Sequence, residues 1–89
     1  MARLEMAGAE MDTMAEAQPS GDNLFELGII YSTGREAATD LVAAHKWFNL
    51  AATRGNDEAA LYRQEVAREM TPLALCEALR AAREWISTH

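Results

Sequence analysis

Apolar residues in the stretch 22–89 recur at intervals of three and four, which is the spacing of one face of an α-helix. The pattern falls into four segments and predicts helices over 22–33, 40–54, 56–70 and 72–86. No run of alternating apolar and polar residues competes for a strand. The sequence therefore predicts an all-α fold of about four helices.

The boundaries of these segments carry residues that begin or end helices. Gly34 and Gly55 follow the first two segments, where a left-handed residue commonly closes a helix. The side chains expected to cap the helix N-termini are Asp22 or Asn23, Asp40, Asn56 or Asp57, and Thr71, the last followed by Pro72. Because the connecting loops are short, consecutive helices should pack antiparallel.

The last three segments each divide into an apolar face and a polar face. His45 falls on a polar face and is expected to be solvated, whereas Cys76 is expected to be a buried small hydrophobe. The residues expected on the apolar faces are Ala44, Trp47, Phe48, Ala51 and Ala52; Ala59, Tyr62, Val66 and Met70; and Leu75, Ala78, Leu79, Ala82, Trp85 and Ile86. The residues expected on the polar face of the second segment are His45, Lys46, Asn49 and Thr53.

The segment 22–33 is apolar almost all round and has to be buried on more than one side. The neighbouring helix covers only one side, so the third helix, the N-terminal arm, a second copy of the chain or a partner protein must cover the rest. Phe25, Ile29 and Ile30 either complete the core or serve as apolar anchors for a partner, with Glu26 as a charged rim residue. An exposed cluster of this kind marks a binding site.

Gly28 lies inside the first predicted helix, where glycine costs about 1 kcal/mol relative to alanine. A close approach by another helix at that point explains why glycine is present. Ala44 and Ala51 flank Trp47 on the second helix and would give the indole ring room against that approach.

One spaced pattern connects the first two helices with the start of the third. Its positions are Leu27, Gly28, Tyr31, Gly34, Asp40, Ala44, Trp47, Ala51, Ala52, Gly55 and Ala59. Over residues 23–55 it resembles the Sel-one-like repeat, a helix–turn–helix relative of the tetratricopeptide repeat. Three departures, Asn23, Glu36 and Ala43, affect loop shape and surface rather than the core. The resemblance implies tetratricopeptide-like antiparallel helix pairs and a protein–protein interaction or adaptor function.

A second, degenerate repeat is visible in the last two predicted helices. The run Ala-Ala-His-Lys-Trp at 43–47 is echoed by Ala-Ala-Arg-Glu-Trp at 81–85. The Leu-Gly pair has become Arg63-Gln64 in this copy, as expected of a terminal repeat that closes a stack. Two repeats are fewer than such arrays usually need, so the end formed by the first helix should require additional cover.

Composition excludes several classes of protein. The 89 residues carry a formal net charge of −6 with no Lys/Arg cluster, which argues against nucleic-acid binding. No apolar run approaches the roughly 18 residues of a membrane span. Residues 1–21 read as an acidic, Met/Ala-rich arm, mobile or weakly helical, followed by a helical repeat domain over 22–89. The N-terminus lacks a secretory pattern, which favours the cytoplasm, and the preference for Arg and Ala suggests a bacterial source.

No catalytic or cofactor-binding constellation is apparent. The single Cys76 excludes a disulfide framework within the chain and a cysteine-based zinc site, and the two histidines lack metal-binding partners. There is no glycine-rich phosphate loop. We therefore expect a non-enzymatic interaction module that docks a protein partner, or a second copy as a homodimer, through the first helix. The alternative is a small regulatory subunit that modulates another protein through its acidic N-terminal arm.

Overall fold

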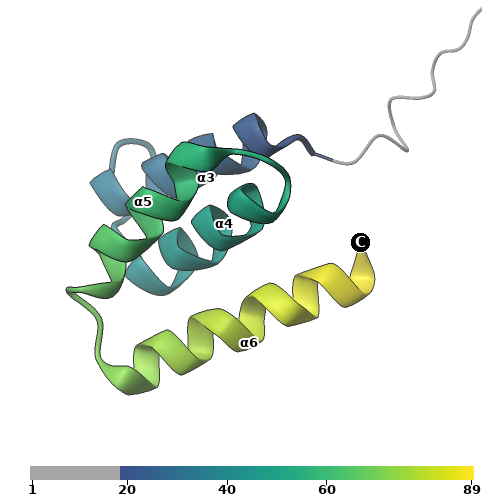
Figure 1. Cartoon of the computed structure of the whole chain (residues 1–89). Coiled ribbons are helices and arrows are strands. Elements are labelled where there is room, and N and C mark those ends of the chain that lie inside the picture. Colours follow the sequence, from purple (N-terminus) through teal and green to yellow (C-terminus); the bar gives the residue numbers. More distant parts are fainter. Residues whose placement is uncertain (1–18) are drawn as a thin grey trace, which may run out of the picture.

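The computed structural model describes residues 19–89, and the proposed arm therefore lies largely outside the described residues. Over 19–89 the chain forms four helices and no strand, which confirms the all-α prediction (Figure 1). The helices are α3 (Gly21–Thr33), α4 (Leu41–Thr53), α5 (Asp57–Ala67) and α6 (Pro72–Thr88).

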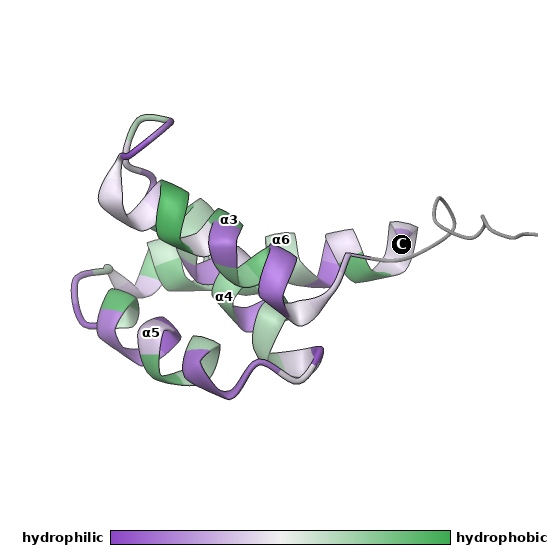
Figure 2. Cartoon of the chain, turned by 90° about the horizontal axis from the view of Figure 1, so that it is seen from above, coloured by the Kyte–Doolittle hydropathy of each residue, from purple (hydrophilic) through white to green (hydrophobic). Residues whose placement is uncertain are grey.

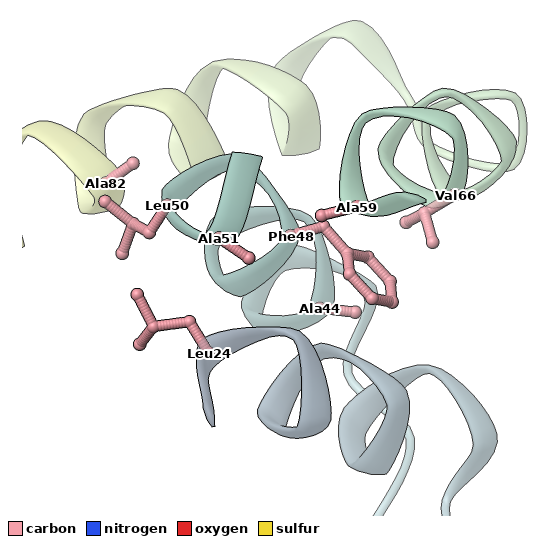
Figure 3. Packing of buried hydrophobic residues seen from close by; sticks show 8 residues of the cluster. All are labelled: Leu24, Ala44, Phe48, Leu50, Ala51, Ala59, Val66 and Ala82. Carbon is pink, nitrogen blue, oxygen red and sulfur yellow. The ribbon is translucent and has the colours of Figure 1, made fainter. Parts of the chain in front are cut away.

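Helix α4 is the centre of the arrangement. The other three described helices all pack against α4 (Figure 1). Figure 3 shows α3 and α6 on opposite sides of α4, with α5 against a third side. Hydrophobic and hydrophilic residues are interleaved along α4 and α6 (Figure 2), as expected for amphipathic helices. A helix contacted by three others has few positions that face solvent, and this explains why His45 on α4 is buried.

Three of the predicted N-caps are confirmed. The Asp40 carboxylate accepts a hydrogen bond from the amide of Ala43 at 3.1 Å. The Asn56 side chain accepts from the amide of Ala59 at 2.9 Å. Thr71, followed by proline at the first helical position, caps α6 in the same way. Each cap satisfies one amide that the helix itself leaves without a partner.

The predicted cap of the first helix is wrong. Ser20, and not Asp22 or Asn23, precedes α3, and the Ser20 hydroxyl accepts from the Asn23 amide at 3.1 Å. The Asn23 side chain in turn accepts from the Ser20 amide at 3.3 Å. This reciprocal capping box satisfies two amides, which explains why the helix begins at Gly21. At its other end Gly34 closes the helix in the left-handed conformation, with φ 73°, as predicted.

The third helix is shorter and the fourth is longer than predicted. Helix α5 ends at Ala67 rather than near residue 70, because the amides of Glu69 and Met70 bond to carbonyls three residues earlier, at 3.0 and 3.1 Å. This tighter hydrogen-bonding closes the helix before Thr71. Helix α6 continues to Thr88 instead of ending near residue 86.

The core lies between α4 and the three helices that pack on it (Figure 3), and it includes the fully buried Phe48. Gly28 is buried against it: a Cβ added to Gly28 would lie 2.5 Å from Cδ1 and 2.9 Å from Cγ of the Phe48 ring. The predicted close approach at Gly28 is therefore confirmed, but its partner is Phe48 and not Trp47. The buried cluster consists of Leu24, Ala44, Phe48, Leu50, Ala51, Ala59, Val66 and Ala82.

Trp47 belongs to a separate contact that attaches α6 to α4. Its ring centroid lies 6.0 Å from that of Trp85, edge to face at 81°. Ala78 and Ala82 are the buried residues of α6. Leu79 and Ile86, predicted on the apolar face, are 39% and 55% exposed. Helix α6 is therefore attached through a narrow strip of small residues and one tryptophan pair.

Candidate functional site

The predicted partner-binding residues of α3 are half-buried or exposed. Phe25 contacts two other aromatic rings: its centroid is 5.6 Å from Phe48 and 5.1 Å from Tyr62, the latter edge to face at 83°. Ile29 also packs against the buried cluster. Ile30 is half-buried as well, but it is not among the residues that contact the cluster. Helix α5 thus supplies part of the additional cover that the sequence required for α3.

Glu26 lies at the rim of this region, as expected. Its carboxylate pairs with the guanidinium of Arg35 at 2.6 Å, and both side chains remain about half exposed. An ion pair so open to solvent contributes at most about 1 kcal/mol to stability. Glu26 is therefore a charged surface residue that a partner could contact, with Arg35 beside it.

Tyr62 is the residue of this surface that the helical spacing assigned to the core. It is 42% exposed, although its ring lies 5.5 Å from Phe48 and also contacts Phe25. We define the α3–α5 face as Phe25, Ile29 and Tyr62, with Glu26 at its rim. Ile30 lies outside this face, about 140° around α3 from Phe25. The face joins half-exposed apolar side chains from two helices that are separate in sequence.

The repeat-defining positions have structural roles within the described residues. Ala44, Ala51 and Ala59 are buried, and Gly34 and Gly55 adopt positive φ. Leu27, Tyr31, Trp47 and Ala52 are partly buried and pack against the core. These observations explain why small or apolar residues occur at these positions, and they assign no chemistry to them.

His45 contradicts the prediction that it is solvated. Its side chain is only 3% exposed, and its Nδ1 has no hydrogen-bond partner. Burial and the nearby Arg63 guanidinium lower the pKa of His45 below its ordinary value. His45 is therefore a neutral imidazole at pH 7 in a place where a polar atom without a partner is costly.

A cavity of about 270 Å³ lies beside His45, where α4, α5 and α6 meet. The polar residues that line it are His45, Asn49, Arg63 and Gln64, and the apolar residues are Ala67, Leu75 and Leu79. The guanidinium of Arg63 donates to the side-chain oxygen of Asn49 at 2.7 Å. Sequence reasoning missed this site because Asn49 and His45 had been assigned to a solvated face.

Cys76 also differs from the prediction, because it is exposed and not buried. Within 19–89 no group of three or more His, Cys, Asp or Glu residues is placed to hold a metal ion. None of the four described helices is long and apolar enough to cross a membrane. No family model, curated protein or solved structure matches this chain.

Proposed function

We propose that the chain is a protein–protein interaction module of the Sel-one-like repeat type, in which α3 and α4 form the tetratricopeptide-like helix pair. The degenerate second copy, α5 and α6, departs from that pairing, because both helices pack on α4. Its partner, another protein or a second copy of the chain, docks on the α3–α5 face. The observation that carries the proposal is the aromatic pair Phe25 and Tyr62, which bridges two helices while Tyr62 remains 42% exposed. Aromatic side chains at a surface are enriched in protein interfaces.

The architecture supports this proposal in a second way. In a stack of helix pairs each pair covers the apolar surface of its neighbour, and an end without a neighbour remains open. Helix α3 packs mainly on α4, and its contact with α5 includes the Phe25–Tyr62 pair. Tyr62 is then the member of the face whose substitution should disturb docking most and the core least, because it is 42% exposed.

Sedimentation equilibrium of the full chain tests the form of the proposal in which the partner is a second copy. We expect reversible association at concentrations from about 10 µM to 1 mM, the range of weak protein contacts. Tyr62→Glu should abolish it, since it places a charge in the contact. Leu73→Glu is the matched control, because Leu73 is 72% exposed on α6 and lies outside the face. Equal association of both variants would refute docking on the α3–α5 face.

Deletion of residues 2–18 separates this proposal from a regulatory role of the acidic arm. Pro19 and Ser20 must be kept, because the Pro19 carbonyl accepts from Arg54 at 2.8 Å and Ser20 caps α3. We expect the shortened chain to associate as the full chain does. Loss of association upon this deletion would favour the acidic arm as the binding element.

A further inference from the structure

The cavity beside His45 is the deep part of an apolar groove between α5 and α6. Both helices pack on α4 and make almost no contact with each other, so α4 forms the floor of this groove. The guanidinium of Arg63 donates to Asn49, and the surface that the cavity exposes is almost wholly apolar. We define the α5–α6 groove as this cavity together with the apolar side of α6 beside it. A groove of this chemistry suits apolar side chains rather than a charged ligand.

Helix α6 presents an apolar stripe along this groove, and the described helices cover only part of it. The stripe consists of residues spaced by four, three and four positions, Leu75, Leu79, Ala82 and Ile86, which lie on one side of the helix. Leu79 is 39% exposed and Ile86 is 55% exposed. Alternating spacings of three and four form the seam along which a second helix packs in coiled coils. This stripe is therefore the side of α6 that a further helix would cover.

Residues 1–18, which lie outside the described residues, carry a stripe of matching spacing and length. Its members are spaced by three, four and three positions and are Leu4, Ala7, Met11 and Met14. As a helix, this segment would measure about 15 Å from its first to its last apolar residue, and the stripe on α6 measures about 16–17 Å. A helix this short is marginal by itself in water and gains its stability from the packing of its apolar side.

The arm joins the described chain at the C-terminal end of α6. The Pro19 carbonyl accepts a hydrogen bond from Arg54 at 2.8 Å, and the same guanidinium lies 5.1 Å from the ring centroid of Trp85. Figures 1 and 2 both show the start of the described chain near the C-terminal end of α6. Four residues separate Met14 from Pro19 and span up to about 14 Å. The arm can therefore reach the stripe at this end of α6 and follow it toward the other end.

The charges of the arm and of the groove are complementary. Residues 1–18 contain four acidic residues and one basic residue, which gives a net charge of −3. Arg83, one turn after Leu79 on α6, is exposed and forms no ion pair with any residue of the described chain. Glu77 and Glu84 lie more than about 100° around α6 from Leu79. None of the described residues that line the cavity carries a carboxylate. An acidic segment on this side of α6 therefore meets the Arg83 guanidinium and no carboxylate of α6.

We propose that residues 4–14 of the chain's own N-terminal arm form a helix that lies in the α5–α6 groove, parallel to α6. Leu4 then lies at the cavity, and Met14 lies near the C-terminal end of α6. The attachment at Pro19 favours this occupant over a segment of another molecule, because a short tether holds the arm at an effective concentration in the mM range. The groove is separate from the α3–α5 face, so this inference does not rest on the proposed function and is tested independently of it.

A nitroxide spin label on Cys76, the single cysteine, tests this arrangement in the full-length chain labelled with ¹⁵N. Cys76 is exposed and lies near the start of α6, at the end of the helix far from Pro19. Docking predicts that the label broadens the NMR signals of residues 4–7 most strongly and those of residue 14 less. Broadening that is absent from the arm, or that is strongest next to Pro19, would overturn the proposal.

A mixed sample distinguishes the chain's own arm from that of a second copy. It contains ¹⁵N-labelled chains without the spin label and spin-labelled chains without ¹⁵N. We expect no broadening of residues 4–7 in this mixture. Broadening equal to that of the singly prepared chain would assign the groove to the arm of a second copy and would overturn the arrangement within one chain.

Two matched pairs of variants identify the contact. Ile86→Glu places a charge on the stripe of α6 and should abolish the broadening, whereas Leu73→Glu, 72% exposed on another side of the same helix, should not. Met11→Glu should also abolish the broadening, whereas Met6→Glu, outside the stripe of the arm, should not. Met11 lies outside the four described helices, so this variant keeps the test valid if Ile86→Glu fails to fold. Equal broadening in Met11→Glu and Met6→Glu would overturn the proposal.

Discussion

Replacing Gly28 with alanine should destabilise the protein, although alanine is the better helix former. The added Cβ would lie 2.5 Å from Cδ1 of Phe48, whose side chain is fully buried at 0% exposure. That ring also packs against Phe25 and Tyr62, which limits its movement. Overpacking of this kind lowers the free energy of unfolding by up to about 3 kcal/mol. The higher helix propensity of alanine offsets about 1 kcal/mol of this loss. The net loss should be about 2 kcal/mol, or roughly 8–16 °C in Tm.

Urea unfolding followed by circular dichroism at 222 nm measures this loss. A double-mutant cycle with Phe48→Leu identifies the cause, because the leucine side chain can turn away from the added methyl group. In the Phe48→Leu background, Gly28→Ala should cost less than about 0.5 kcal/mol. The reasoning is refuted if Gly28→Ala is as stable as the wild type, or if its cost is the same in both backgrounds.

Three further predictions concern a cap, a helix attachment and a buried histidine. Asp40→Ala removes the acceptor of the Ala43 amide and should cost about 1 kcal/mol in urea unfolding, so an unchanged midpoint would contradict the assigned cap. Trp85→Ala removes the contact with Trp47, and hydrogen exchange should become faster in α6 but not in α3; unchanged exchange in α6 would contradict the attachment described. Because the folded chain lowers the pKa of His45 below 6.5, stability should be fully present above that pH and fall as the pH drops below it. Urea unfolding at pH 7.5 and 5.5 should show a smaller fall for His45→Gln, and an equal fall in both proteins would contradict this cause.

The sequence predicted most of the helix boundaries because they depend on local chemistry. Asp40, Asn56 and Thr71 each bond an amide three residues ahead, which needs no tertiary contact. Ser20 was missed because Asp22 and Asn23, two and three residues further along the chain, are capping residue types as well. The spacing of small and apolar residues also predicted a close helix approach at Gly28.

Exposure was predicted less well, because it depends on how many helices surround each one. His45 was assigned to solvent on the assumption that α4 packs on one side, whereas α3, α5 and α6 all contact α4. The same arrangement placed Phe48 rather than Trp47 against Gly28 and left Trp47 to contact Trp85. Cys76 was expected to be buried, but α6 buries only the strip of Ala78 and Ala82. The cavity beside His45 follows from this packing around α4 and has no sequence motif of its own.

Site-specific photo-cross-linking tests the central proposal, docking on the α3–α5 face, most directly. A p-benzoylphenylalanine side chain is placed at Tyr62 or, as the matched control, at Leu73 in the full chain, and each protein is irradiated in its native cell. Docking on the face predicts a discrete adduct from position 62 and none from position 73. A chain that gives no adduct from position 62, or the same adducts from both positions, would contradict the proposal.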